Sequence, residues 1–273
     1  MKLELFATPN FPLRASHLEK FLSCNWREVL LVFGAVDSSG EAADIGSAVH
    51  AAIDTWHKTE QNAAAAVEAM RTRLNEYPKA DLPQAAALFL AYAADPSNIS
   101  ADIVLGETEV TFEISPSPED PTGTPITIVG HTDQVRREKG VLKVWDVKTS
   151  KKMPHEVLWS TCVQGAAYCA GATKLLGETV HPGGIIMPRR SPMHIPFTWT
   201  VNDIDRILDP IRHHVALVRK GIVSHVPEAD RCKWCHTGGP DVCLPQLRYH
   251  LPVLKGQVAK TEDLERRIDL RQG

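Results

Sequence analysis

The sequence predicts an α/β fold in which a small mixed sheet is flanked by helices. Two observations lead to this prediction. Helical spacing of apolar residues dominates the first hundred residues, and the alternation typical of strands begins near residue 103, before helical patterns return at residue 154. With 273 residues, of which 43% are hydrophobic, the chain can bury a sizeable core.

The expected elements follow from these periodicities. An amphipathic helix is predicted over residues 41–58, because Ile45, Val49, Ile53 and Trp56 recur at helical spacing. The further predicted helices are 60–76, 83–94, 154–176, 202–221 and one charged helix near 261–271. The predicted strands, apart from a central hairpin, are 103–114, 183–187 and 193–201.

The hairpin, within Val129–Thr149, is the segment around which the other elements are expected to gather. Its arms are predicted over 125–138 and 141–148, with Lys139-Gly140 as the turn. A two-residue loop makes Asp133 face Asp146 across the ladder, and directly opposed like charges repel.

Lys148 lies on the same face of its strand as Asp146, because strand side chains alternate. Two opposed carboxylates beside one lysine favour binding of a hard divalent cation with oxygen ligands. We therefore expect Asp133 and Asp146 to hold Mg²⁺ or Mn²⁺, with the Val147 backbone carbonyl as a further ligand. A metal lowers the pKa of a bound water, and Lys148 would orient that water and neutralise charge on a phosphate.

Composition and charge exclude several other classes. A net charge of −3 gives no global attraction to nucleic acid, so basic contacts would have to be local. Residues 1–15 lack a secretory pattern, and the longest apolar stretch, near residues 29–36, is too short to span a bilayer. We expect a soluble cytoplasmic protein with no membrane partner, whose 6 cysteines are reduced or metal-bound.

The hairpin motifs resemble those of a known family. Gly130-His-Thr-Asp133, followed by Trp145-Asp-Val-Lys148-Thr149, is similar to the paired motifs of the PD-(D/E)xK nucleases, and most similar to the RecB/AddB/Cas4-like branch. That resemblance implies a restriction-endonuclease-like core. Three other matches occur in the family's order. His50, at the end of Gly46–His50, matches an extra metal ligand, and the Gln164-x3-Tyr168 pair matches a downstream motif. Glu109, or less favourably Glu107, matches the acidic residue of the first strand.

The resemblance implies a single nuclease domain over residues 1–250 and a charged tail over 251–273. Within the domain it implies a helical insert at 41–95, a catalytic core at 103–221 and a cysteine-bearing segment at 227–245. Its activity would be metal-dependent exonucleolytic hydrolysis of single-stranded DNA or duplex ends, without sequence preference. Asp133, Asp146, Lys148, Gln164 and Tyr168 would form the catalytic set.

DNA, and a separate helicase, recombination or CRISPR protein, are the partners that the resemblance implies. The resemblance also implies a role in DNA repair, recombination, phage DNA processing or CRISPR adaptation, in a bacterium or a phage. The candidate DNA contacts are Arg136, Arg137, Lys151, Arg189, Arg190 and Trp234, the last by stacking on a base.

The cysteines form a second candidate site. Cys232, Cys235 and Cys243 have C-x2-C-x7-C spacing, and Cys24 could complete a four-thiolate site for zinc or a [4Fe–4S] cluster. Spacing alone slightly favours zinc. The family resemblance favours a structural [4Fe–4S] cluster that joins one early cysteine to three late ones. Asn25, where the family usually has proline, and the long last gap depart from its pattern.

Less specific interpretations exist for each motif. His50 alone is more often a packed histidine, Gln164 and Tyr168 are more often helix-packing residues, and Asp133 and Asp146 could be solvated strand charges. Two rival functions follow: a non-catalytic nucleic-acid-binding or adaptor protein on the same fold, and a zinc-stabilised nuclease.

Overall fold

The computed structural model describes residues 3–24, 28–29, 31, 41–75, 81–150, 154–189 and 192–223. Within these ranges the side chains at 23, 41–42 and 154–162 are not described. The chain forms two compact units, each built from segments distant in sequence. Unit 1 combines Met1–Ser38, Glu113–Ile128 and Asp209–Gly273, and unit 2 combines Ser39–Phe112 and Val129–Leu208. The hairpin and the residues expected to gather around it lie in unit 2.

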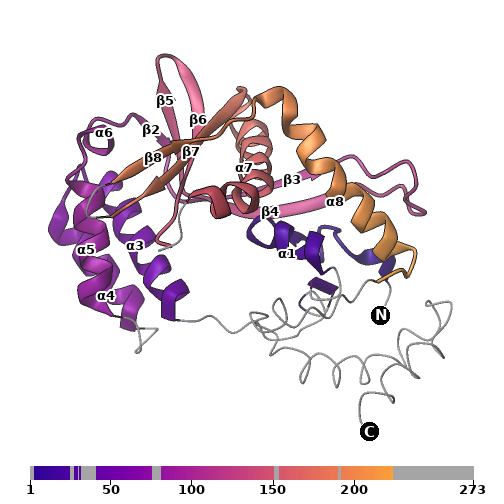
Figure 1. Cartoon of the computed structure of the whole chain (residues 1–273), viewed down its shortest axis with the longest axis horizontal. Helices are drawn as coiled ribbons and strands as arrows, with labels where there is room; N and C mark the ends of the chain where they lie inside the picture. The colour runs from indigo at the N-terminus through magenta and orange to yellow at the C-terminus, as the bar shows by residue number, and fades with distance from the viewer. Residues whose placement is uncertain are drawn as a thin grey trace, which may run out of the picture. The chain divides into compact units, whose positions relative to one another are not determined.

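The helical part of unit 2 comprises α3 (Glu41–Lys58), α4 (Ala63–Asn75), α5 (Leu82–Ala93) and the short α6 (Pro96–Ile99). Figure 1 shows α3, α4 and α5 packed side by side. α4 starts later than predicted because the Asn62 side chain caps it, accepting hydrogen bonds from the amides of Ala64 (3.0 Å) and Ala65 (3.1 Å). Asp81 caps α5 in the same way, at 3.3 Å from the Gln84 amide.

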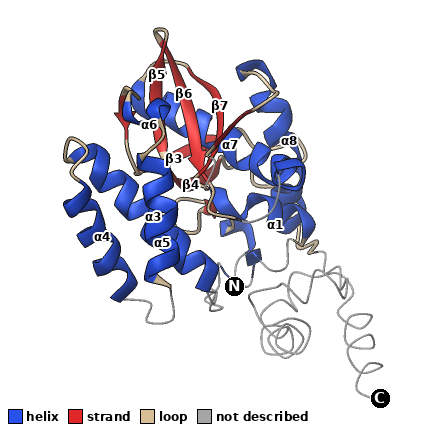
Figure 2. Cartoon of the chain, turned by 60° about the vertical axis from the view of Figure 1, so that its left-hand side comes forward, coloured by secondary structure: helices blue, strands red, loops and turns tan. Residues whose placement is uncertain are grey.

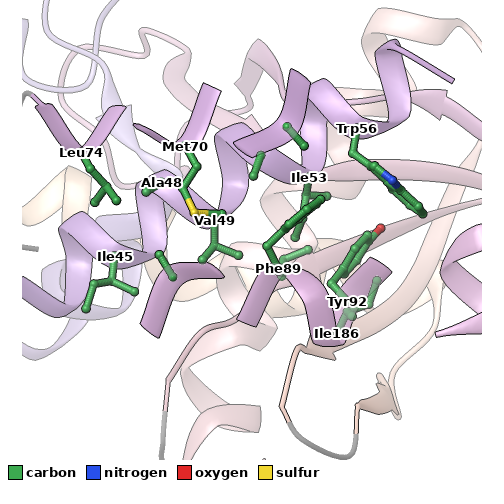
Figure 3. Packing of buried hydrophobic residues seen from close by; sticks show 14 of the residues in the cluster. Ile45, Ala48, Val49, Ile53, Trp56, Met70, Leu74, Phe89, Tyr92 and Ile186 are labelled. Atoms are coloured by element: carbon green, nitrogen blue, oxygen red, sulfur yellow. The ribbon is translucent and has the colours of Figure 1, made fainter. Parts of the chain in front are cut away.

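The apolar stripe predicted for α3 forms one side of a buried core. Ile45, Val49, Ile53 and Trp56 are each at most 4% exposed and pack against α4 and α5 (Figure 3). The Trp56 ring meets the Tyr92 ring edge-on, with 6.0 Å between centroids. The cluster also includes Trp145, Val147 and Ile186 of the sheet, so the helices are packed directly on the strands.

The main sheet of unit 2 is five-stranded and mixed, as predicted. Its order is β2-β5-β6-β7-β8, and the strands are β2 (Ile103–Leu105), β5 (Gln134–Glu138), β6 (Val141–Val147), β7 (Val180–Met187) and β8 (Met193–Pro196). β6 and β7 are parallel, and the other neighbours are antiparallel. α7 (Pro154–Leu176) connects the parallel pair and packs against both strands (Figure 2).

The hairpin register agrees with the prediction from the pair Glu138 and Val141 to the pair Gln134 and Trp145. The ladder ends there, so Asp133 and Asp146 do not form the predicted cross-strand pair, because the chain bends at Asp133 and its carboxylate accepts the Val147 amide instead. Lys139 (φ 51°) and Gly140 (φ 82°) both have left-handed backbone, as a two-residue hairpin turn requires.

Two predicted strands are interrupted. The first hairpin arm bends at Asp133, so β4 (Ile126–Thr132) leaves the hairpin and joins a three-stranded sheet of order β1-β4-β3. β1 is Leu13–Arg14 and β3 is Thr108–Ile114. The strand predicted over 103–114 is likewise divided between β2 and β3, because Asp54 of α3 accepts the Glu107 backbone amide at 3.0 Å. Alternation along the sequence does not reveal either break.

A β-bulge lies beside the second half of β6. Val144 pairs with Pro182 and Trp145 pairs with Gly184, so Gly183 is an extra residue in β7. A Cβ atom on Gly183 would collide with the Val144 carbonyl and the Trp145 ring. Glycine is therefore required where β7 passes the residue before Asp146.

Unit 1 contains the 3₁₀ turns η1 (Leu3–Leu5) and η2 (Ala15–His17), the helix α1 (Leu18–Ser23) and most of α8 (Ile204–Arg219). The turn η3 (Val201–Asp203) precedes α8. Arg219 is fully buried and pairs with Asp120 at 2.6 Å. It also donates to the carbonyls of Phe6 (3.0 Å) and Thr124 (2.6 Å), so one side chain joins three segments of this unit.

No helix in the described ranges combines the length and apolar character needed to cross a membrane. The charged helix expected near 261–271 lies outside the described residues.

Candidate active site

The structure brings together four of the predicted residues from separate elements of unit 2. His50 lies in α3, Asp133 at the bend before β5, Asp146 in β6 and Lys148 directly after β6. His50 Nδ1 is 2.9 Å from Asp133 Oδ1. Lys148 Nζ lies 3.0 Å from Oδ1 and 2.9 Å from Oδ2 of Asp146. The hairpin thus places both carboxylates in one cluster of charges.

Gln164 and Tyr168 extend this cluster from α7. Lys148 Nζ donates to Gln164 Oε1 at 3.1 Å, and Gln164 Nε2 donates to the Tyr168 hydroxyl at 2.6 Å. Their spacing of four residues places them on one face of the helix. The amide of Gln164 therefore links the lysine to the tyrosine.

Burial and mutual charge shift the ionisation of the first pair in opposite directions. Burial would lower the pKa of His50, but the Asp133 carboxylate outweighs it and raises that pKa to about 9. Burial would raise the pKa of Asp133, but His50, Lys148 and the Val147 amide hold it below its usual value. His50 is therefore an imidazolium paired with a carboxylate at neutral pH.

Burial raises the pKa of Asp146 to about 6, with Lys148 opposing the shift and Asp133 adding to it. Burial would lower the pKa of Lys148, but the two aspartates raise it. Burial also raises the pKa of Tyr168 well above its usual value. The lysine remains a cation and the tyrosine keeps its proton.

Two cationic side chains therefore compensate two carboxylates, of which Asp133 is 11% and Asp146 is 3% exposed. The donor set, two carboxylates and one imidazole, fits a hard divalent metal such as Mg²⁺ or Mn²⁺. Asp146 Oδ2 makes no hydrogen bond of good geometry, although Lys148 Nζ is close to it, so a lone pair remains for a ligand. Across the described residues, no group of three His, Cys, Asp or Glu side chains forms a ready-made metal centre.

A small pocket marks the open side of this cluster. Its lining is His50, Ile53, Asp54, Glu107, Asp133 and Val147. Glu107 rather than Glu109 is therefore the acidic residue of this region that faces the cluster. The Glu109 carboxylate lies 3.4 Å from His131 on an exposed surface, and its role in metal binding stays a prediction. The break at Gly106-Glu107, which the alternation pattern did not reveal, brings Glu107 to the pocket.

The predicted DNA-contact residues lie in different environments in the structure. Arg136 is only 3% exposed and its guanidinium is surrounded by side-chain acceptors, so the prediction that it contacts DNA is wrong. Arg137 pairs with Glu178 at 3.2 Å, toward the hairpin turn and away from Asp133. Arg189 donates to the Ser150 carbonyl at 2.9 Å, two residues beyond Lys148. Lys151, Arg190 and Trp234 lie outside the described residues.

The cysteine site is represented by one residue. Cys24 is half-buried directly after α1, with a free thiol. Cys232, Cys235 and Cys243 lie outside the described residues, so their relation to Cys24 stays a prediction.

Sequence analysis missed several residues that support the site. Asp54 lies one helical turn beyond His50, a spacing that could have identified it. Tyr92 and Gln134 gave no signal, because their relation to the hairpin comes only from tertiary packing. Gly46 is close-packed: a Cβ atom there would lie 3.2 Å from the Thr149 hydroxyl.

Comparison with known proteins identifies the fold and the family. A solved structure of a "Putative exonuclease" from Eubacterium rectale is similar in fold, with a TM-score of 0.52 at 15% sequence identity. The similarity covers 79% of this chain and 84% of that chain. No similar protein was found among the curated proteins. A family model described as the PD-(D/E)XK nuclease superfamily matches residues 12–239, which is most of the sequence, and the chain therefore belongs to the PD-(D/E)XK nuclease superfamily.

Proposed function

We propose that the protein is a Mg²⁺- or Mn²⁺-dependent DNA exonuclease of the RecB/AddB/Cas4-like branch. The observation that carries the proposal is the connected set Asp146–Lys148–Gln164–Tyr168 beside the His50–Asp133 pair. An adaptor protein that had lost catalysis would have no need of a partly buried lysine held between a carboxylate and an amide.

Asp133, Asp146, the Val147 carbonyl and His50 would hold the metal, and Glu107, which lines the same pocket, would join them. When bound, the metal would activate a water and stabilise negative charge on the phosphate. His50 would bind only as a neutral imidazole, so the proton that Asp133 now stabilises would have to leave.

The chain's own residues supply positioning and charge. Asp146 and Gln164 fix Lys148 from two sides, so its ammonium has one direction left in which to donate to a water or to a phosphate oxygen. Tyr168 accepts the Gln164 amide, so its own O–H can donate to the substrate. Hydrolysis forms a bond between a water oxygen and phosphorus and breaks the bond from phosphorus to a sugar oxygen, which leaves as a hydroxyl after taking up a proton. The Lys148 and Tyr168 donors would stabilise the negative charge that develops on the phosphate.

DNA ends and single strands are the proposed substrate, because the RecB/AddB/Cas4-like motifs imply it and the similar solved structure carries the word exonuclease in its name. Arg189, tied to the segment after Lys148, is the described cation best placed for a backbone phosphate. A separate helicase, recombination or CRISPR protein would deliver the substrate in repair, recombination, phage DNA processing or CRISPR adaptation.

For Cys24, Cys232, Cys235 and Cys243 we propose a structural [4Fe–4S] cluster, with zinc as the alternative. Anaerobic purification with metal analysis separates the two, since a cluster absorbs near ~400 nm and contains iron and sulfide. Replacement of Cys24 by serine should abolish that absorbance. Zinc without iron in the wild-type protein would reject the cluster.

Cleavage of end-labelled DNA, with Mg²⁺, Mn²⁺ or a chelator, tests the enzymatic proposal. Lys148→Ala and Asp133→Ala should each abolish cleavage, whereas Arg71→Ala, which changes an exposed arginine of α4, should retain it. Mononucleotide products from labelled ends distinguish an exonuclease from an endonuclease. Equal cleavage by Lys148→Ala and the wild type, or DNA binding without cleavage, would favour the adaptor alternative.

A further inference from the structure

A largely buried polar cluster lies beside the candidate active site, where side chains of α3, α5, α6 and β5 meet. We call it the Arg136 network, and it consists of His57, Tyr92, Asn98, Gln134 and Arg136. Tyr92 and Asn98 are 0% exposed, and Gln134 and Arg136 are at most 3% exposed. The members come from α3, α5, α6 and β5, so the network joins the helical part of unit 2 to the catalytic hairpin.

The hydrogen bonds of the network allow only one arrangement. Arg136 donates to Gln134 Oε1 from Nε (2.9 Å) and from Nη2 (2.7 Å), which directs the amide nitrogen of Gln134 to the Tyr92 hydroxyl (2.6 Å). Arg136 Nη2 also lies 3.2 Å from that hydroxyl and can share one of its two hydrogens with it, so the hydroxyl is surrounded by donors on this side. The Tyr92 proton must then go to His57 Nε2, 2.7 Å away.

That assignment requires a neutral His57 with its proton on Nδ1. Burial and the positive charge of Arg136 lower the pKa of His57 to about 4, which agrees with a neutral ring. Asn98 completes the set, since its Oδ1 accepts from Arg136 at 2.8 Å and its Nδ2 donates to the Tyr92 carbonyl at 3.0 Å.

The network and the active site share one helix and one strand. Gln134 directly follows Asp133, and His57 lies about 10.5 Å beyond His50 along α3, at 1.5 Å per residue. α3 is thus fastened to the start of β5 at two points, by His50–Asp133 and by His57–Tyr92–Gln134. Two attachments fix both the distance and the rotation of a strand relative to a helix, which one contact cannot do.

Burying a guanidinium costs solvation free energy, and this cost is greatest where no carboxylate pairs with it. No carboxylate in the described part of the chain forms an ion pair with Arg136 among the contacts resolved, and neutral oxygens satisfy it instead. Its guanidinium carbon lies 5.7 Å from the centre of the Trp145 ring, and Trp145 pairs with Gln134 across the ladder and precedes Asp146. The network therefore contacts the residue next to each of the two aspartates.

We propose that Tyr92, Gln134 and Arg136 are positioning residues that hold Asp133 against His50 and so set the geometry of the active site. The catalytic consequence rests on the proposed nuclease function, while the structural consequence does not. Tyr92→Phe is the sharpest variant, because it removes only the hydroxyl on which three side chains converge and leaves the ring in the core.

The experiment measures two quantities on the full-length protein. The first is the side-chain ¹⁵N–¹H resonance of His50 without added metal, assigned by its absence in His50→Gln. The second is the split between kcat and KM for end-labelled DNA. Tyr92→Phe should shift the His50 resonance and lower kcat about 10- to 100-fold, the effect expected from a small misplacement, with KM changed less than about twofold.

Phe89→Leu is the matched control, because Phe89 lies in the same helix and the same core but makes no polar contact with the network. It should lower the melting temperature at least as much as Tyr92→Phe, yet leave the His50 resonance and kcat in place. An unchanged His50 resonance or an unchanged kcat in Tyr92→Phe, or equal changes in Phe89→Leu, would overturn the proposal. A wild-type protein without nuclease activity would reject the proposed function, and the His50 resonance would still decide the positioning role.

Discussion

The Asp133 carboxylate accepts a hydrogen bond of 2.7 Å from the backbone amide of Val147. Asp133 stands where the chain turns from β4 into β5, and Val147 ends β6. This bond therefore closes the open end of the hairpin, as Lys139-Gly140 closes the other end. Val147 itself lines the pocket together with His50 and Asp133. A residue proposed to bind metal thus has a structural task as well.

Gln164 should be needed for the rate of cleavage rather than for DNA affinity. Gln164→Leu removes the acceptor that fixes Lys148 and the donor to Tyr168, so we expect kcat to fall roughly 10- to 100-fold with KM nearly constant. Steady-state kinetics on labelled DNA measures this split.

Tyr168→Phe is the control for that variant, because it removes the tyrosine hydroxyl but keeps the Gln164 contact with Lys148. A smaller loss is expected there. If Gln164→Leu cleaves at the wild-type rate, the lysine does not depend on this amide.

Gly184→Ala should destabilise the protein more than Gly171→Ala. The added Cβ at Gly184 would meet the backbone of Ile195 and Pro196, which cannot move without disturbing the β7–β8 pair. At Gly171 it meets the side chains of Val110 and Phe112, and alanine also favours the helix α7.

We expect a loss of about 1–3 kcal/mol or more at Gly184, the cost usual for overpacking. Urea denaturation of the two variants provides the comparison. Equal midpoints would mean that the sheet edge beside Trp145 is more adaptable than the structure indicates.

The buried Arg219–Asp120 pair should be a main source of stability in unit 1. Arg219→Met leaves the Asp120 carboxylate buried without its partner, for which a cost of about 3–5 kcal/mol is expected. Arg206→Met is a suitable control, because that arginine is 77% exposed and its ion pair with Asp203 should contribute little. Chemical denaturation decides between them, and a loss at Arg219 no larger than at Arg206 would contradict this role.

The sequence predicted best what depends on neighbouring residues. The hairpin turn, its register and the grouping of Asp146 with Lys148 follow from a two-residue loop and from alternation, both of which are local rules. The bend at Asp133 was missed because it depends on β4 pairing in another sheet. Glu109 was preferred to Glu107 from the family resemblance alone, and the break at Glu107, whose amide the Asp54 side chain accepts, is not visible in the alternation pattern.

Arg136 is the clearest failure of sequence reasoning. Arginine is rarely buried, so an arginine in a hairpin with basic neighbours is expected to face solvent. Its acceptors Tyr92 and Asn98 lie 44 and 38 residues away in sequence. Only the packing of α5 and α6 on the sheet makes a buried position acceptable, and no pattern within β5 indicates that packing.

His57 should make stability depend on pH between about 4 and its ordinary value near 6.5. Burial, and then the charge of Arg136, lower its pKa in the folded protein to about 4, while Asp54 opposes the shift. As the pH falls below 6.5, the unfolded chain gains a proton that the folded chain resists, so the free energy of unfolding falls until about pH 4. The stabilisation is therefore complete above the unfolded pKa and is lost on acidification.

His57→Gln, whose amide oxygen can accept the Tyr92 proton, should reduce the slope of unfolding free energy against pH in that window. Above pH 7 the two curves should run parallel, and an unchanged slope between pH 4 and 6.5 would show that His57 is not held neutral by the network.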